Sequence, residues 1–161
     1  MKRTLAILLL LAAASWCRCQ QPLLGFTISQ DSVFLPQGKE ALVIYYSTTN
    51  CHQCMVDLTK KVLKWQSRKP GREVYVLTRG GDIADMRFLA GGARSFFAPG
   101  ECPPIIFDKD TAIAGRYFGG NDGSIGPGLL HFSRDGGHRY YSYADMFVNK
   151  GSRRMRWPIR R

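Results

Sequence analysis

Two cysteines separated by two residues are the feature that most constrains this chain. The segment Cys51-His52-Gln53-Cys54 follows an apolar run after four polar residues and precedes a stretch with helical periodicity. Two thiols at this spacing can close into a disulfide and open again by thiol-disulfide exchange. The pattern therefore predicts a redox-active dithiol at a junction between a strand and a helix.

The segments on either side of the dithiol agree with this interpretation. Residues 41–46 are β-branched and aromatic, which is typical of a strand buried on both faces. Apolar residues at intervals of three and four then predict a helix over about 52–66: Met55, Leu58, Val62 and Trp65. Asn50 is the expected N-cap, which puts Cys51 at the helix N-terminus and favours its thiolate. Cys54 lies one turn further in and is expected to react second.

Other roles for the cysteine pair fit the sequence less well. A structural zinc site needs two more ligands, and the candidates Cys102, His131 and His138 are scattered. A static disulfide across so short a loop would remove little entropy from the unfolded chain. A peroxidatic cysteine normally comes with a Pro-x-x-x-Thr-x-x-Cys pattern, but Ile44 stands at the proline position before Thr48.

The N-terminal segment predicts export. Two basic residues precede an apolar stretch over 5–14, which is short for a membrane span and resembles a secretory signal. We expect a signal peptide within residues 1–19, cleaved after Ala14 or, as the alternative, after Cys19. A periplasmic or otherwise exported location places the thiols in an oxidising compartment, where the dithiol needs a redox partner or serves as an oxidant.

The chain is basic, with a formal net charge of +11, and its end is especially so. Residues 149–161 form a basic tail that contains Trp157. In an exported protein we expect no nucleic-acid partner. Two interpretations of the tail stay open: weak contact with an anionic membrane or acidic partner, and a solvated chain end.

The order of the expected elements indicates one α/β domain over residues 25–148. A chain of 161 residues with 45% hydrophobic content suits a single domain of this kind. Further strands are predicted at 26–29, 33–35, 74–77, 105–107, 129–132 and 138–143. Further helices are predicted from Asp82 toward Phe96 and over 111–118.

Three groups of residues carry a resemblance to a known family. They are Phe26-x-Ile28 with Leu35 and Gly38-Lys39, the strand 41–46 with Cys51-x-x-Cys54, and the segments 104–117 and 127–136 with their Asp-Lys-Asp and Asp-Gly turns. Over about residues 25–145 the chain resembles the TlpA/ResA-like thiol-disulfide oxidoreductases, in the AhpC/TSA-redoxin branch of thioredoxin-like proteins. The resemblance implies a thioredoxin-like three-layer fold, a central mixed β-sheet flanked by helices, with an extra N-terminal β-hairpin and an inserted strand-helix.

The resemblance also implies a substrate groove beside the dithiol. Pro127 takes the place of the family's cis-proline, which faces the dithiol and offers backbone for pairing with a substrate. Gly126, His52 and Gln53 complete the expected substrate-binding set. His52 has two interpretations, a cation that strengthens the thiolate or a solvated side chain with no role.

Pro103 competes with Pro127 for the cis-proline position. Pro103 and the following strand at 105–107 would fit the shorter thioredoxin spacing and bring Cys102 to the active site. We favour Pro127, because only this choice accounts for both that strand and the hairpin at 129–143.

Several positions depart from the family pattern. Tyr45 stands where thioredoxin has a buried aspartate, Asn50 replaces the usual tryptophan, and Thr59 replaces a proline in the helix. Asp57 matches the acidic residue that follows the second cysteine. It is expected to accept the proton of Cys54, or else to be a plain surface carboxylate near the helix N-terminus.

The sequence thus predicts an exported thiol-disulfide oxidoreductase that reduces or exchanges disulfides in substrate proteins. The expected catalytic residues are Cys51, Cys54 and Asp57, with no cofactor and no metal. Protein disulfides and a redox partner protein are the expected partners of a monomer. The alternative is a carrier on the same fold that holds a soft metal such as copper through the two cysteines.

Overall fold

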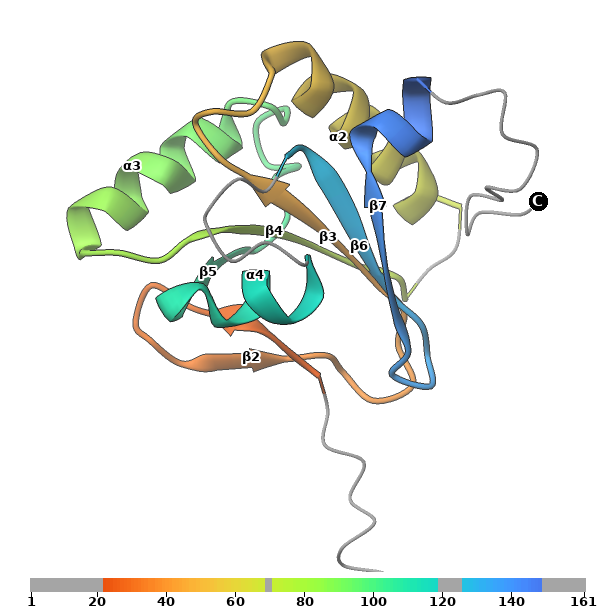
Figure 1. Cartoon of the computed structure of the whole chain (residues 1–161), viewed down its shortest axis with the longest axis horizontal. Coiled ribbons are helices and arrows are strands. Elements are labelled where there is room, and N and C mark those ends of the chain that lie inside the picture. Colours follow the sequence, from red (N-terminus) through yellow and green to blue (C-terminus); the bar gives the residue numbers. More distant parts are fainter. Residues whose placement is uncertain (1–21, 69–70, 119–125, 149–161) are drawn as a thin grey trace, which may run out of the picture.

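The computed structural model describes residues 22–68, 71–118 and 126–148. The expected signal peptide (1–19) and basic tail (149–161) lie outside these residues. The described residues form a seven-stranded sheet in the order β2-β1-β5-β4-β3-β6-β7, flanked by helices (Figure 1). The strands are β1 (Leu23–Phe26), β2 (Ser32–Phe34), β3 (Ala41–Tyr46), β4 (Glu73–Arg79), β5 (Ile105–Asp108), β6 (Gly128–Phe132) and β7 (His138–Ser142). The helical segments are α2 (His52–Gln66), α3 (Ile83–Arg94), η1 (Lys109–Thr111), α4 (Ala112–Tyr117) and η2 (Ala144–Val148).

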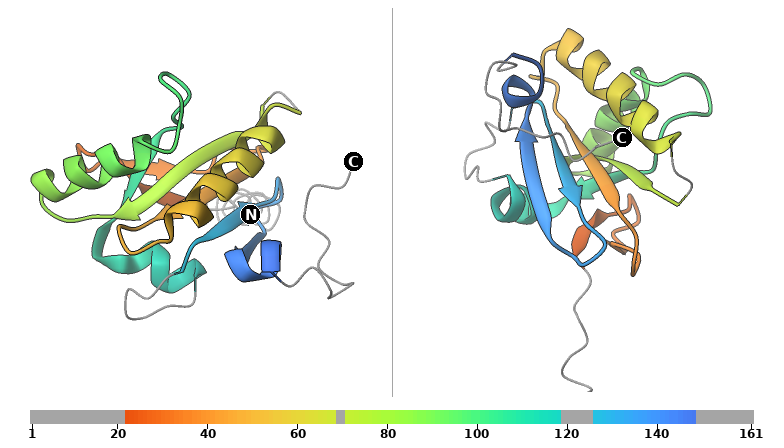
Figure 2. Two further views of the ribbon diagram at one scale, coloured as in Figure 1. Left: turned by 90° about the horizontal axis from the view of Figure 1, so that it is seen from above. Right: turned by 90° about the vertical axis from the view of Figure 1, so that its right-hand side faces the viewer.

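Strand β3 lies inside the sheet between β4 and β6, and all six of its residues are buried. It pairs in parallel with β4 and antiparallel with β6, so the sheet is mixed. Leu42 and Ile44 pack with the apolar faces of α2 and α3, whereas Val43 and Tyr45 pack with α4 on the other side of the sheet. Figure 2 shows these helices on opposite faces. The predicted three-layer α/β architecture is confirmed.

The N-terminal hairpin is present, but its first strand begins earlier than predicted. We expected a strand at 26–29, whereas β1 ends at Phe26 and pairs with β2 and with β5. The chain turns at Thr27 because its backbone N–H donates to the Asp31 carbonyl at 2.8 Å. The Thr27 hydroxyl also donates to the Asp31 carboxylate at 3.3 Å. These local bonds compete with the strand ladder and end it.

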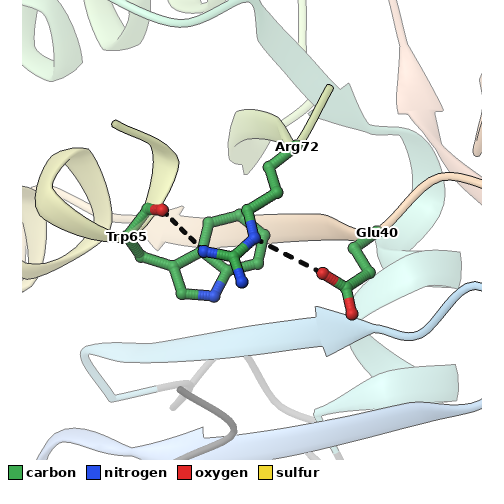
Figure 3. Close-up of polar contacts among 3 residues, drawn as sticks. All are labelled: Glu40, Trp65 and Arg72. Carbon is green, nitrogen blue, oxygen red and sulfur yellow. Dashed lines mark hydrogen bonds and ion pairs between the residues drawn. The ribbon is translucent and has the colours of Figure 1, made fainter. Parts of the chain in front are cut away.

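Arg72 ties the C-terminal end of α2 to the sheet (Figure 3). Its Nη1 donates to the Trp65 carbonyl at 2.8 Å, and its Nε lies 3.5 Å from Glu40 Oε2. The guanidinium also lies over the Trp65 ring, 4.3 Å from its centroid. One planar group thus makes a hydrogen bond, an ion pair and a stacking contact. The cluster helps to fix how α2 lies on the sheet.

Replacing Arg72 by lysine should therefore destabilise the fold. An ammonium group keeps the charge but loses the planar fork and the stacking, so Arg72→Lys should lower the free energy of unfolding by about 1–2 kcal/mol. Urea denaturation of the purified protein measures this change. The matched control is Arg68→Lys in the exposed turn that follows α2, with a change within about 0.5 kcal/mol. Equal effects of the two substitutions would contradict the assignment.

Candidate active site

The two cysteines lie at the N-terminus of α2, the helix that follows β3 in the chain. Cys51 is exposed and Cys54 is half-buried. The Cys51 sulfur accepts the backbone N–H of Cys54 at 3.3 Å, so Cys51 itself is the N-cap. The prediction of Asn50 as N-cap is wrong, because the Asn50 amide donates to the Tyr45 carbonyl at 3.1 Å instead. The reactive sulfur therefore occupies the place where a helix presents unpaired amides.

The two thiols differ in acidity because they share a hydrogen bond. The Cys54 side chain, and next the backbone N–H groups of Cys54 and Gln53, lower the pKa of Cys51. Burial, followed by the bond to Cys51, raises the pKa of Cys54 to about 11. Near neutral pH Cys54 therefore keeps its proton, while Cys51 is the sulfur that can become the attacking thiolate.

Asp57 lies one turn beyond Cys54 and is held by two donors. Its Oδ1 accepts the Gln53 side-chain amide at 2.9 Å, and its Oδ2 accepts the Tyr143 hydroxyl at 2.9 Å. The charge of Asp57 raises the pKa of both cysteines, so the carboxylate lies within electrostatic range of the dithiol. Each carboxylate oxygen has a further lone pair, which leaves Asp57 able to accept a proton.

Tyr143 is the site residue that sequence reasoning missed. The hydrogen bond to Asp57 is the first cause that raises the pKa of Tyr143 to about 12. The two residues are 86 positions apart in the chain. The alternating pattern over 138–143 predicts a strand, but nothing in it indicates which ring reaches α2. A general rule that buried tyrosine hydroxyls find a partner was the only available signal.

His52 and Gln53, both expected to bind substrate, lie on the exposed first turn of α2. The His52 ring lies 5.0 Å from the ring of Phe96, which follows α3. Gln53 is turned toward Asp57, as described above. The structure thus brings Gln53 to the candidate proton acceptor and His52 to an aromatic neighbour.

The cis conformation predicted for Pro127 is wrong. No peptide bond is cis within residues 22–68, 71–118 and 126–148, so the Gly126–Pro127 bond is trans. The trans form is intrinsically favoured by about 0.5–1 kcal/mol. Here the Pro127 carbonyl also accepts the Tyr143 N–H at 2.8 Å, which continues the β6–β7 ladder. Exposed Gly126 remains beside it, and its carbonyl accepts the Tyr140 hydroxyl at 3.4 Å.

The sheet register bears on the choice between Pro127 and Pro103. Extending the β3–β6 register by two residues places Pro127 opposite Tyr46, at the end of β3 from which the chain continues to Cys51. Pro103 instead precedes β5, at the amino ends of the parallel strands. The Cys102 sulfur next to it donates to the Pro103 carbonyl at 3.3 Å. The register therefore favours Pro127 as the proline on the dithiol side.

Within the described part of the chain, no three His, Cys, Asp or Glu side chains gather as a metal site would require. No helix among the same residues is long and apolar enough to cross a membrane.

Comparison with known proteins identifies the fold. No family model matches the sequence, and no curated protein matches it either. Among solved structures, a putative protein disulfide isomerase from Bacteroides thetaiotaomicron is similar, with a TM-score of 0.54, 15% identity and coverage of 76% of each chain. The exposed lipoprotein thioredoxin of Streptococcus pneumoniae gives a TM-score of 0.52 at 14% identity, covering 73% of this chain and 85% of that one. The chain has a thioredoxin-like fold.

A third similar structure, a putative thioredoxin from Neisseria meningitidis, gives a TM-score of 0.50 at 19% identity and covers 76% of this chain and 78% of that one. The predicted thioredoxin-like fold is therefore confirmed. In it, the described dithiol follows β3 and opens α2, which places both cysteines at one edge of the sheet.

The opposite pKa shifts predict unequal reactivity of the two thiols. Because the pKa of Cys51 is lowered and that of Cys54 is raised to about 11, iodoacetamide near neutral pH should label Cys51 much faster. Labelling of Cys54 should become appreciable only as the pH approaches that higher value. Mass spectrometry of peptides from the reduced protein, quenched at successive times and pH values, measures both rates. Equal rates near neutral pH would show that the two thiols do not share a proton in this way.

Proposed function

We propose that this protein is an exported thiol-disulfide oxidoreductase that reduces or exchanges disulfides in substrate proteins, as the TlpA/ResA-like family does. The observation that carries the proposal is the placement of an exposed Cys51 and a half-buried Cys54 at the N-terminus of α2, where the Cys51 sulfur accepts the Cys54 N–H. The opposite pKa shifts of the two thiols agree with it. An exposed thiolate beside a protonated, half-buried thiol suits a two-step exchange reaction.

In the first step the Cys51 thiolate attacks one sulfur of the substrate disulfide. The substrate S–S bond breaks, a Cys51–substrate disulfide forms, and the other substrate sulfur leaves as a thiolate that takes a proton from water. Attack consumes the negative charge on Cys51. Cys54 then no longer has a thiolate to which it can donate its hydrogen bond.

In the second step Cys54 resolves the mixed disulfide. Its proton passes to the Asp57 carboxylate while its sulfur attacks Cys51 Sγ. The bond to the substrate breaks, and the substrate leaves as a second thiolate, which is protonated in turn. The substrate has gained two electrons and the protein is left with a Cys51–Cys54 disulfide. A redox partner protein returns the two electrons by the reverse exchange.

The substrate docks where β6 begins, on Gly126 and Pro127 beside the first turn of α2. Proline has no N–H, and the Pro127 carbonyl is already used by Tyr143. The Gly126 carbonyl accepts the Tyr140 hydroxyl, so the Gly126 N–H is the backbone group that pairs with an extended substrate. Export is supported by the leader-like sequence of residues 1–19 and by the exposed location stated in the name of the pneumococcal thioredoxin.

Substitution of the resolving cysteine should trap substrates. Cys54→Ser removes the thiol that completes the second step, so mixed disulfides with partner proteins should accumulate and be released by dithiothreitol. Cys51→Ser, the matched control, should trap none. Electrophoresis without reductant, before and after dithiothreitol, detects the complexes.

The trapping experiment also tests the copper-carrier alternative. A copper carrier would bind Cu(I) stoichiometrically through both cysteines. The Cys54→Ser variant of such a carrier would capture no disulfide partner. Titration of the reduced protein with Cu(I) under a competing chelator, beside the trapping experiment, separates the two functions.

Loss of the Asp57 carboxylate should slow the second step alone. The reduced protein can be mixed with the aromatic disulfide dithiobisnitrobenzoate, which releases one coloured thiolate in each step; Cys17, Cys19 and Cys102 are first replaced by serine. Asp57→Asn should slow the second release by about 100-fold, the size of a typical general-base contribution. The first release should not slow, because the charge of Asp57 raises the pKa of Cys51. Asp85→Asn on the exposed first turn of α3 is the matched control and should change neither phase.

A further inference from the structure

Tyr143 touches both halves of the candidate site. Its hydroxyl donates to Asp57 on α2 at 2.9 Å, while its backbone N–H donates to the Pro127 carbonyl at 2.8 Å. It lies directly after β7, the strand that pairs with β6 along its whole length. One residue therefore joins the expected substrate-docking strand to the carboxylate beside the dithiol.

The ring of Tyr143 is held by its own neighbours. It stacks on Phe147 of η2 with centroids 4.6 Å apart and an interplanar angle of 21°. The Phe147 ring in turn lies 4.5 Å from Lys61 Nζ on α2. These contacts fix the direction in which the Tyr143 hydroxyl points, and they do not depend on the hydroxyl itself.

Each oxygen of the Asp57 carboxylate accepts a hydrogen bond from a different side chain. Gln53 binds one oxygen and Tyr143 binds the other, so the side chain is held in one orientation. Asp57 follows Cys54 by three residues on the same helix, and side chains at this spacing are neighbours. A base that is already oriented loses less freedom when the reaction occurs, which lowers the barrier.

We propose that Tyr143 is a positioning residue for the resolving step, which holds Asp57 beside Cys54 and links it to the strand that docks the substrate. This inference rests on the proposed oxidoreductase function. In the step itself the proton moves from Cys54 to Asp57, the Cys54 sulfur supplies the electron pair to Cys51 Sγ, and Tyr143 keeps its own proton throughout.

Two elements packed against Tyr143, α2 and η2, carry the titratable groups around it. Cys54, Asp57 and Lys61 come from α2, and Cys51 is the N-cap of this helix. Asp145 comes from η2, and its carboxylate accepts the Ser142 hydroxyl at 2.6 Å. With a pKa of about 12 the Tyr143 phenol remains a donor while the cysteines titrate.

Tyr143→Phe tests the proposal, because it removes only the hydroxyl. The ring can still stack on Phe147, and the backbone N–H can still bind Pro127. With dithiobisnitrobenzoate, the second thiolate release should slow about tenfold, as expected for loss of a hydrogen bond to a charged group, while the first release stays unchanged. Tyr117→Phe, a hydroxyl deletion in α4 on the other face of the sheet, is the matched control and should change neither phase.

Two further measurements separate positioning from a structural defect. The deficit of Tyr143→Phe should shrink as the pH rises, because Cys54 then loses its proton without help from a base. It should also vanish in an Asp57→Asn background, because a residue that acts through Asp57 has nothing left to position.

Each outcome bears on one hypothesis. If the unsubstituted protein releases no second thiolate, the proposed oxidoreductase function fails. If it does release one, a Tyr143→Phe protein with an unchanged second phase overturns the inference and leaves the function intact. A deficit that persists at high pH, or that adds to that of Asp57→Asn, overturns it equally.

Discussion

The placement of two thiols at one helix N-terminus, the first exposed and the second half-buried, governs the chemistry available to this protein. The proton that Cys54 donates lowers the pKa of Cys51, and donating it helps to raise the pKa of Cys54 to about 11. Backbone amides at the start of α2 add to the first effect, and burial adds to the second. The same short stretch of chain therefore produces one reactive sulfur and one sulfur that keeps its proton.

The sheet serves this arrangement by bringing distant segments to one edge. Strand β3 ends where the dithiol begins, and β6 runs antiparallel beside it, so its first residues lie near the same edge. Strand β7 then returns along β6 and delivers Tyr143 to α2, 86 residues after Asp57 in sequence. At the other end of α2, Arg72 and Trp65 hold the helix against the sheet. Helix α2 is thus held at both ends. Arg72 holds its C-terminal end through Trp65, and the Tyr143–Asp57 hydrogen bond holds its N-terminal end.

Features that depend on periodicity and local order could be predicted from the sequence. The buried strand at 41–46, the helix over about 52–66 and the closing hairpin all follow from spacing and turn residues. The exact N-cap could not be predicted in this way. Asn50 and Cys51 can both cap a helix, and only tertiary contacts decide which of the two side chains does so. The end of β1 was missed because the bonds between Thr27 and Asp31 compete with the ladder at short range.

The parts of the site that depend on long-range geometry were beyond the sequence. The isomer of the Gly126–Pro127 bond follows from how β6 and β7 pair, and the resemblance to a family carried the cis form over without that information. The partner of Asp57 lies on another element, and no pattern within 138–143 distinguishes Tyr143 from Tyr140 or Tyr141. Local periodicity therefore predicts which residues carry the chemistry better than which residues orient them.

The capping role of Cys51 has a consequence for the driving force of electron transfer. The negative charge that the Cys54 thiol and the helix amides stabilise exists only in the dithiol form, because the disulfide has no thiolate. Contacts that favour only the reduced form raise the reduction potential, which makes the disulfide a stronger oxidant and the dithiol a weaker reductant. The negative charge of Asp57 works against this effect at both sulfurs. The balance between a helix end and a single carboxylate thus sets how readily this protein accepts electrons, as well as how fast it passes them on.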